Sequence, residues 1–497
     1  MSELSRIAGE IDGVQVEGPT PDGVEVGGLV LDSREVAAGD LFACVPGAAS
    51  DGHDHAHAAV EAGAVALLAE RPLEGLDVPQ LVVPSVRAAL GTAANVVWDW
   101  PSRELEVYGV TGTNGKTTVT HLLRSILEQA GHTVGVIGTL GARIGDERIE
   151  TGFTTPEAPG LQATLRAMAD RGCDAVTMEV SSHALDQGRV DGTRFAATCF
   201  TNLTRDHLDY HTGFEDYFAA KRRLFTTTDD GELRPAAVNV DNEWGNRLFD
   251  ELVHSEREDV PVWGYTTTGM ARASVSAKYL LSPTGASITI ESPVGDVEIA
   301  SPLRGRFNVE NVLSAATVAL LAGVGPEDIA AGVAATGGVP GRFQAIDAGQ
   351  DFQVIVDYAH TPDSLENVLR SAVDITDGDV ILVFGCGGDR DRSKRPIMGQ
   401  AAARLADVAI VTSDNPRSED PKAIIREIVV GMRGARAEVV VEVDRQAAIE
   451  QAIGRARTGD TVVIAGKGHE LGQEFADRTI PFDDSAVARA ALDGAAV

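Results

Sequence analysis

The sequence predicts an α/β protein of three domains, and three observations support this prediction. The chain has 497 residues, which is long for a single hydrophobic core. Short apolar segments with strand character alternate with helical segments along most of the chain, which is typical of parallel sheets covered by helices. Turn-forming residues interrupt the alternation near residues 100 and 338, so we expect domains at 1–99, 100–337 and 338–497.

The first domain is predicted to be a small α/β unit. Strand character is found in GGLVLDSR, GDLFACVPG, AVALLAE and PQLVVPS, and the Ala-rich residues 54–62 have helical character. A Trp-Pro pair in DWPSRELEVYGV then marks a linker that leads into the next strand.

The second domain is predicted to contain a parallel sheet of the P-loop ATPase type. The strand LEVYGV, the loop TGTNGKT, the helix TVTHLLRSILEQAG and the strand TVGVIGT follow one another as a β-loop-α-β unit. Further strands end at Glu179 and near residue 203. Residues 272–300 alternate apolar and polar side chains, which predicts an antiparallel hairpin added to this sheet.

The third domain is predicted to be Rossmann-like and doubly wound. It begins near GGVPGRFQ, and its strands FQVIVDYA, DVILVFG, DVAIVTSD, AEVVVEV and DTVVIAGKG alternate with helices. Inside it, the stretch TSDNPRSEDP (412–421) is polar and turn-prone, so we expect it to lie outside any core. Arg417 stands at the tip of this predicted turn with Asp414 behind it, which raises the question of whether the pair binds a ligand.

Composition excludes several classes of protein. A formal net charge of −32 argues against a nucleic-acid binder, which would need clustered Lys and Arg. The sequence shows neither an apolar run of the ~20 residues that a membrane helix needs nor a charged-then-apolar leader, so we expect a cytoplasmic protein. Cys44, Cys173, Cys199 and Cys386 lie far apart, which favours reduced, buried thiols over disulfides or a zinc site.

The loop TGTNGKT has the chemistry of a phosphate site. Gly112 and Gly115 allow backbone N–H groups to approach phosphate oxygens, and the following helix N-terminus adds partial positive charge. Lys116 can reach the outer phosphates and Thr117 can ligate Mg²⁺. The spacing departs from the strict Walker pattern, because Val110 stands where that pattern has its first glycine. Glu179, at the end of an apolar strand, is a hard carboxylate suited to the same metal ion.

Many motifs in one order resemble the Mur ligases, the ATP-dependent amide-bond-forming enzymes of cell-wall synthesis, to which folylpolyglutamate synthetases are more distantly similar. The motifs are TGTNGKTT, TMEVSSHALDQGR, TNLTRDHLDYH, YFAAKRRLF, RGRFNVENVLSAA, PGRFQ, DYAHTPDSL, GCGGDRDRSKRP, DNPR and GKGHE. Together they span the central and C-terminal domains, and LVLDSR and PGAASDG extend the resemblance into the first.

The resemblance implies roles for individual residues. Catalytic roles fall to Lys116, Glu179, His207 and Lys221, and Mg²⁺ would be bound by Thr117, Glu179, His207 and Lys221 carbamylated to N6-carboxylysine. ATP would be bound by Gly112, Thr113, Asn114, Gly115, Lys116, Thr117, Thr118, Asn308, Arg342 and Asp357, with Asn311 and His360 nearby. Closure of the third domain would complete this site.

Two further sets of contacts follow from the same resemblance. The UDP-linked substrate would contact Leu31, Ser33, Ala48, Ala49, Ser50, Thr154, Thr155, Ser181, Gln187 and Arg189. Many relatives have Asn before the two threonines, where this chain has Phe153. Diaminopimelate would contact Arg390, Asp414, Asn415, Pro416, Arg417, Gly466 and Glu470. A guanidinium can hold a carboxylate in a bidentate manner, so Arg417 would select the second carboxylate that L-lysine lacks.

The implied reaction adds meso-2,6-diaminopimelate to the D-glutamate carboxylate of UDP-N-acetylmuramoyl-L-alanyl-D-glutamate through an acyl phosphate, with ATP as co-substrate and Mg²⁺ as cofactor. These small molecules would be its partners, with no nucleic acid and no membrane, and the chain would act as a monomer. A sister ligase that adds another amino acid, or a folylpolyglutamate-synthetase-like enzyme, remains an alternative. The alternative from another class is a nucleotide-dependent switch without ligase activity, although the guanine motif N-K-x-D is absent from the sequence.

Overall fold

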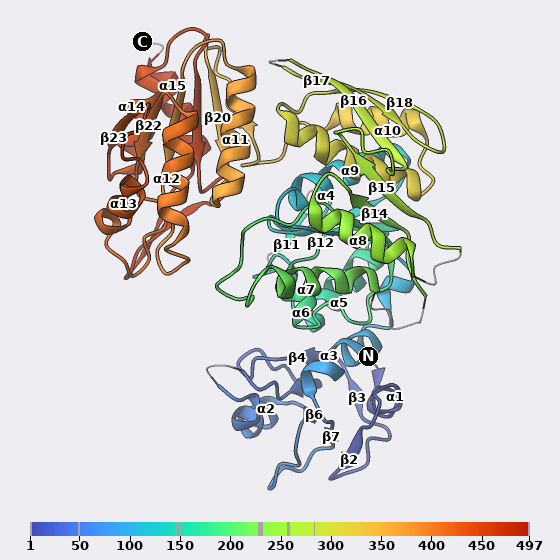
Figure 1. Ribbon diagram of the computed structural model, residues 1–497. Coiled ribbons are helices and arrows are strands. Elements are labelled where there is room, and N and C mark those ends of the chain that lie inside the picture. The colour runs from blue at the N-terminus through green and yellow to red at the C-terminus, as the bar shows by residue number, and fades with distance from the viewer. Residues whose placement is uncertain are drawn as a thin grey trace.

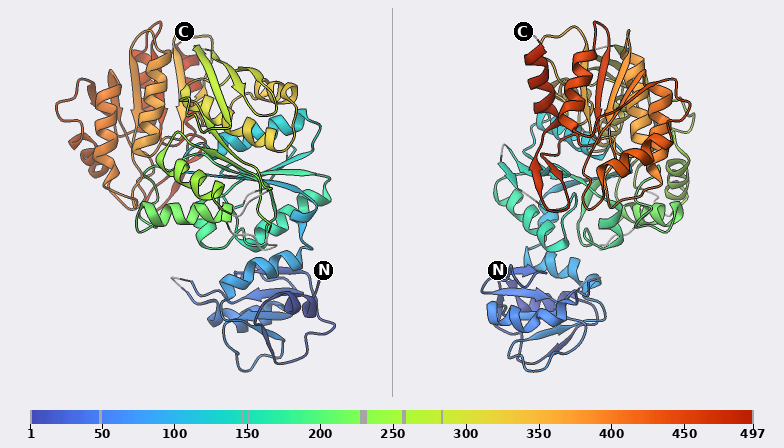
Figure 2. Two further views of the ribbon diagram at one scale, coloured as in Figure 1. Left: turned by 45° about the vertical axis from the view of Figure 1, so that its right-hand side comes forward. Right: turned by 90° about the vertical axis from the view of Figure 1, so that its left-hand side faces the viewer.

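The computed structural model describes residues 2–47, 50–145, 147–149, 151–226, 232–255, 259–282 and 284–495. Three units follow one another along the chain, and each has its own main sheet (Figures 1 and 2). The N-terminal unit, in blue, lies at the end of the molecule remote from the orange and red C-terminal unit, and the central unit lies between them. The predicted α/β class is confirmed.

The N-terminal unit contains a five-stranded sheet in the order β2-β7-β6-β5-β4. All four predicted strands are present, and residues 54–62 form the end of a 3-10 turn followed by helix α2. The strands are β2 (Gln15–Glu17), β4 (Gly28–Val30), β5 (Asp40–Ala43), β6 (Ala66–Ala69) and β7 (Gln80–Val82), with a small pair β1 (Ser2–Glu3) and β3 (Glu25–Val26) beside them. The helices are α1 (Leu4–Glu10), α2 (Ala56–Ala62) and α3 (Val86–Val97).

The central unit is built on an eleven-stranded sheet in the order β11-β10-β9-β12-β8-β13-β14-β15-β16-β17-β18. The strands from β9 to β16 in this order pair in parallel, as expected for a P-loop type sheet. The strands are β8 (Glu106–Thr111), β9 (Val134–Gly138), β10 (Gly141–Ile144), β11 (Glu147–Ile149), β12 (Ala175–Glu179), β13 (Phe195–Phe200), β14 (Ala236–Asn239), β15 (Val262–Thr266), β16 (Val275–Ser282), β17 (Gly285–Glu291) and β18 (Val297–Ser301).

Antiparallel additions occur at both edges of this sheet. The predicted hairpin within 272–300 is confirmed as β16 and β17, and β18 extends it to three antiparallel strands. A second hairpin, β10 with β11, extends the opposite edge and was not predicted. It follows β9 directly, and β10 runs back along β9, pairing from Gly138 to Gly135.

Helices cover both faces of the central sheet because its inner strands are apolar on both sides. Helices α4 (Lys116–Gln129), α9 (Arg306–Leu321) and α10 (Pro326–Ala335) pack over one face, where Leu122, Val312 and Ile329 share a core. The other face is covered by α5 (Ala158–Asp170), α6 (Ser182–Asp186), α7 (Phe214–Thr226) and α8 (Glu243–Val253). A short 3-10 turn, η2 (Pro101–Arg103), joins this unit to the N-terminal one.

The C-terminal unit is doubly wound, as predicted, with the strand order β19-β20-β24-β21-β22-β23. Only β19 is antiparallel to its neighbour. The strands are β19 (Gln344–Ala345), β20 (Gln353–Asp357), β21 (Val380–Phe384), β22 (Val408–Val411), β23 (Glu438–Val441) and β24 (Thr461–Ala465), with a hairpin of β25 (Gly472–Glu474) and β26 (Thr479–Pro481). The helices are α11 (Pro362–Ile375), α12 (Lys394–Leu405), α13 (Pro421–Val430), α14 (Arg445–Arg455) and α15 (Asp484–Ala495).

The expectation that residues 412–421 lie outside any core is wrong for the first half of this stretch. Thr412, Ser413, Asp414 and Asn415 are buried. They follow β22 at the carboxyl edge of the sheet and are covered by the β25–β26 hairpin, where Gln473 Nε2 donates to the Asp414 carbonyl at 2.8 Å. Their burial is tolerated because partners distant in sequence satisfy their polar groups.

The four cysteines are all free and buried, as expected. Among the described residues, no helix is both long and apolar enough to cross a membrane.

Candidate active site

A cavity of about 410 Å³ that contains the phosphate loop, the main cavity, lies between the central and C-terminal units. Its floor is formed by the phosphate loop, residues 113–118, and by Glu179 at the end of β12. Residues 357–360, at the end of β20 and directly after it, close the opposite side. The cavity therefore lies at the carboxyl ends of parallel strands, where α/β proteins bind their ligands.

The phosphate loop requires its glycines. Gly112 has φ +150° and Gly115 has φ +90°, conformations that L side chains rarely adopt. A Cβ atom on Gly112 would lie 1.9 Å from Thr201 Oγ1, and one on Gly115 would lie 2.4 Å from Asn311 Oδ1. Helix α4 begins at Lys116 immediately after this loop, so its free backbone N–H groups are available to an anion.

Two lysines meet at one backbone carbonyl. Lys116 Nζ donates to Gly112 O at 2.9 Å and to Thr113 O at 2.9 Å, and Lys221 Nζ donates to Gly112 O at 2.8 Å. Lys221 lies on α7, as predicted, and is 1% exposed, so it is not a solvated helix cation. Burial and the nearby Lys116 charge lower the pKa of Lys221 well below its ordinary value, and burial also lowers the pKa of Lys116.

Glu179 is buried and joins the phosphate loop to the strand beside it. Its Oε2 accepts hydrogen bonds from Thr117 Oγ1 and Thr139 Oγ1, both at 3.1 Å, and its Oε1 accepts from Thr139 N at 2.8 Å. Arg342 Nη2, from the segment entering the C-terminal unit, donates to Thr117 Oγ1 at 3.1 Å. The Thr117 hydroxyl and the Glu179 carboxylate form a hard oxygen pair, which is the donor type that Mg²⁺ prefers.

His207 lines the main cavity in a conformation rare for a non-glycine residue, with φ +52°. Its ring contacts His183 edge-on, with centroids 4.9 Å apart, and burial lowers the pKa of both imidazoles. Asp206 Oδ2 lies 3.4 Å from His207 Nε2. Within the described ranges, no three His, Cys, Asp or Glu side chains gather closely enough to hold a metal ion by themselves.

The residues that the sequence assigned to ATP are mostly brought together. Thr113, Asn114, Gly115, Lys116, Thr117, Thr118, Asn311, Arg342, Asp357 and His360 line the main cavity. Asp357 accepts hydrogen bonds from Phe343 N at 2.6 Å and Ala359 N at 2.7 Å, and burial raises its pKa to about 6. Gly112 and Asn308 do not line the cavity. Asn308 instead accepts a hydrogen bond from Asn311 Nδ2 at 3.0 Å, so it lies behind Asn311, which lines the cavity.

The residues assigned to the UDP-linked substrate fall into two groups. Thr154, Thr155, Ser181 and Arg189 line the main cavity, and Gln187 Oε1 accepts from Arg189 Nη2 at 2.7 Å beside it. Leu31, Ser33 and Ser50 lie in loops of the N-terminal unit and do not line this cavity, and Ala48 and Ala49 lie outside the described residues.

Phe153 lies at the cavity and is 56% exposed, and the Arg189 guanidinium stacks over its ring at 4.5 Å from the centroid. Position 153, where the resemblance leads to an expectation of Asn, therefore presents an aromatic face at the cavity.

A second cavity of about 190 Å³ adjoins the main one and shares Asp206, His207, Tyr358 and His360 with it. Six of the seven residues assigned to diaminopimelate line this second cavity: Arg390, Asp414, Asn415, Arg417, Gly466 and Glu470. Pro416 does not line it. The two cavities together place an amino-acid-sized space directly beside the phosphate loop.

Arg417 is held by neighbours that sequence reasoning did not identify. Its Nε lies 2.8 Å from Glu474 Oε2, and its Nη1 donates to Gly388 O at 2.9 Å. Its backbone has φ +52°, which costs of order 1 kcal/mol or more in a non-glycine residue and is typical of functional sites. Asn415, by contrast, uses its side chain within the protein, donating to Glu470 Oε2 at 2.7 Å and accepting from Lys467 Nζ at 2.8 Å.

Arg395 is a further residue that was not predicted. This fully buried side chain donates to Gly387 O at 3.2 Å and to both carboxylate oxygens of Glu419, at 2.7 and 3.0 Å. It thus ties the loop after β21 to the loop after β22, and the two loops carry Arg390 and Arg417. The basic motif RSKRP made Arg395 noticeable in the sequence, but the sequence did not indicate that its side chain is buried.

Comparisons with known proteins agree over the whole chain. Three family models match successive parts of the chain. Residues 25–98 match the model described as "Mur ligase family, catalytic domain". Residues 110–319 match "Mur ligase middle domain", and residues 341–468 match "Mur ligase, glutamate ligase domain". The UDP-N-acetylmuramoyl-L-alanyl-D-glutamate--2,6-diaminopimelate ligase of Geobacillus thermodenitrificans is 46% identical over 99% of each chain. The enzyme of the same name from Streptomyces coelicolor is 46% identical over 95% of this chain and 94% of its own.

A solved structure described as UDP-N-acetylmuramoyl-L-alanyl-D-glutamate--2,6-diaminopimelate ligase covers 100% of both chains at 33% identity with a TM-score of 0.72. The likeness therefore extends from the sequence to the arrangement of the units. Because the sequence is 46% identical to a member over 99% of the chain, the protein belongs to the Mur ligase family, the ATP-dependent amide-bond-forming ligases of cell-wall synthesis.

Proposed function

We propose that this protein joins meso-2,6-diaminopimelate to the D-glutamate carboxylate of UDP-N-acetylmuramoyl-L-alanyl-D-glutamate, with cleavage of ATP to ADP and phosphate. One observation carries the choice of amino acid. Arg417 lines the second cavity, and among the residues that the structure describes, Glu474 and Gly388 bind two of its five N–H groups. The others remain for a carboxylate, the group that distinguishes diaminopimelate from lysine.

The reaction needs an activated carboxylate, because hydroxide is a poor leaving group at neutral pH. The carboxylate attacks the terminal phosphorus of ATP, giving an acyl phosphate and ADP. The amine of diaminopimelate then attacks the acyl carbon, and phosphate leaves as the amide forms. The protein contributes chiefly by positioning the reactants and stabilising charge. The adjoining cavities would hold the acyl phosphate and the amine as neighbours.

Lys116 and the N-terminus of α4 would stabilise the negative charge of the phosphates. In this structure Lys116 Nζ donates to two loop carbonyls, so a phosphate would exchange those hydrogen bonds for charge-assisted ones. Arg342 would add a second cation from the C-terminal unit.

We also propose Mg²⁺ as the cofactor, with Thr117, Glu179 and His207 as the residues that would hold it. When bound, Mg²⁺ neutralises phosphate charge. A carbamate on Lys221 would add an oxygen ligand from a residue whose depressed pKa favours the neutral, nucleophilic amine. In that step the amine nitrogen bonds to the carbon of CO₂ and loses one proton, which leaves an anionic carboxylate.

The domain boundaries, the oligomeric state and the location in the cell remain proposals. The three family matches fall within the domain ranges 1–99, 100–337 and 338–497, which supports those boundaries. We further propose that the chain acts as a monomer and in the cytoplasm, where nucleotide-linked precursors and ATP occur together.

The experiment that tests the function is a substrate comparison. The purified protein is incubated with ATP, Mg²⁺ and the UDP-linked dipeptide, and with meso-diaminopimelate, L-lysine or L-ornithine, and the product mass is measured. We expect the diaminopimelate product, together with ADP and phosphate. Preferential addition of L-lysine would refute the assignment of Arg417, and release of AMP would refute the acyl-phosphate route.

A further inference from the structure

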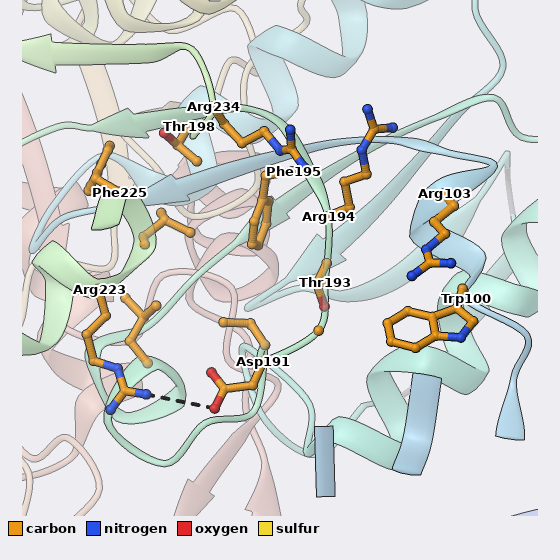
Figure 3. A pocket seen from close by; sticks show the side chains of 14 residues that line it. Trp100, Arg103, Asp191, Thr193, Arg194, Phe195, Thr198, Arg223, Phe225 and Arg234 are labelled. Carbon is orange, nitrogen blue, oxygen red and sulfur yellow. Dashed lines mark ion pairs between the residues drawn. The ribbon is translucent and has the colours of Figure 1, made fainter. Parts of the chain in front are cut away.

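A third cavity, drawn in Figure 3, lies at the amino ends of strands of the central sheet, whereas the main cavity lies at their carboxyl ends. Its lining includes Arg103, Arg194 and Arg234, which precede strands β8, β13 and β14 respectively. These three strands are neighbours in the sheet and run parallel, so the three arginines lie side by side where the strands begin. This side of the sheet is its amino edge. Arg223 reaches the same cavity from α7.

The charge of this cavity is positive in a chain whose formal net charge is −32. Asp191 is the one acid among the described lining residues, and it lies 3.8 Å from Arg223 Nη2. Arg234 Nη1 pairs with the exposed Glu232 at 2.6 Å. Within the described ranges Arg103 and Arg194 form no ion pair. At least two guanidinium groups are therefore available to an external anion.

The cavity also adjoins the connection between the N-terminal and central units. Trp100, one of its lining residues, packs against the N-terminal core, and the Arg103 guanidinium stacks 4.0 Å from the centroid of its ring. Asp99 and Trp100 have φ of +56° and +52°, so two successive residues of the linker are in a strained conformation. On the other side, Asn95 of α3 donates to the Asp191 carbonyl at 3.4 Å.

We propose that this cavity, the amino-edge cavity, is a binding site for a small multivalent phosphate anion, with pyrophosphate as its simplest representative. Arginine suits this ligand because its planar fork binds phosphate oxygens in pairs. The volume of about 120 Å³ is well below the ~300 Å³ at which pockets for drug-sized molecules begin, which excludes a whole nucleotide. A bound anion would link the strained linker at Arg103 to the residues that precede strands β13 and β14.

The test measures binding of pyrophosphate to the full-length protein by titration calorimetry. It is done in the Lys116→Ala background, so that phosphate binding at the phosphate loop is suppressed. We expect one site per chain, with affinity weakened at least ~10-fold in the Arg103→Gln/Arg194→Gln variant through loss of charge-assisted bonds. Arg478→Gln, which removes a cation 64% exposed on the C-terminal unit, is the matched control and should leave the affinity unchanged.

Two further measurements keep the proposal falsifiable. Arg194→Gln alone alters an exposed side chain, so it should remain folded and should still weaken binding several-fold. Pyrophosphate should change tryptophan fluorescence through Trp100, and Trp100→Phe should abolish that change. UDP should not compete. Undetectable pyrophosphate binding, equal affinity in the double-arginine variant, or competition by UDP would each overturn the proposal. None of these outcomes bears on the ligase reaction, which is assayed separately.

Discussion

Replacing Arg417 should separate recognition of the amino acid from every other step. In Arg417→Ala the carboxylate of diaminopimelate loses two charge-assisted hydrogen bonds, and truncation of one partner of such a pair costs roughly 2–5 kcal/mol. That cost corresponds to an increase in the KM for diaminopimelate of about 30-fold or more. The KM for ATP should change little, because Arg417 lines the second cavity and not the main one.

The assay is steady-state phosphate release with each substrate varied in turn. Arg417→Gly is the informative control, because glycine accepts the φ of +52° without strain and preserves the loop while removing the side chain. Both variants should show the same loss with diaminopimelate. If the KM for diaminopimelate stays within a factor of two in both, or if the KM for ATP rises equally, Arg417 only shapes the loop.

Three other perturbations have defined outcomes. Lys221→Ala should lower kcat on the order of 10²-fold or more, as expected when a charge-stabilising group is lost. Depletion of CO₂ should lower the activity of the wild-type protein, and bicarbonate should restore it. Full activity in the variant would refute this role of Lys221. Burial raises the pKa of Glu310 from 4.5 to about 7, so the folded state binds a proton more tightly than the unfolded state and stability falls as pH rises between these values. Glu310→Gln should therefore gain stability over wild type between pH 5 and pH 8, by up to about 3 kcal/mol in urea unfolding, and a pH-independent difference would contradict the shift. Gly332→Ala should destabilise the protein by about 1–3 kcal/mol because its Cβ would lie 2.4 Å from Ile126 Cα, whereas the control Gly454→Ala, with nothing within 4 Å, should be neutral or stabilising; equal unfolding midpoints would show that α10 moves to accommodate the methyl group.

The parts of the fold that could be predicted are those encoded by contiguous residues. Runs such as VILVF within DVILVFG are apolar throughout because both faces of their strands are covered, and they were identified with correct boundaries to within a few residues. The phosphate loop was recognisable because its glycines and Lys116 are adjacent in sequence. The β10–β11 hairpin was missed because its short strands, GARI and ERI, contain Arg and Glu and lack the apolar run by which the other short strands were recognised.

Properties that depend on distant partners could not be predicted. Burial of Asp414 and Asn415 depends on Lys467 and Gln473, more than 50 residues away in sequence. The same holds for Glu474, whose pairing with Arg417 follows from the β25–β26 hairpin covering this loop. The depressed pKa of Lys221 likewise arises from its surroundings, so no residue pattern contains it.

One carboxylate, that of Asp363 at the start of α11, connects the C-terminal unit to the phosphate loop. Its Oδ2 accepts from Asn114 Nδ2 at 2.9 Å and from Thr204 Oγ1 at 3.0 Å. Each such bond has a net value of only about 1 kcal/mol, because water offers equivalent partners when it breaks. Asp363 is not the only link between the two units: Arg342 Nη2 donates to Thr117 Oγ1 at 3.1 Å, and Phe307 of α9 packs against the core of the C-terminal unit. Opening of this boundary for product exit would therefore break the Asp363 hydrogen bonds together with the Arg342 and Phe307 contacts, and Asp363 would account for only a small part of the free-energy cost.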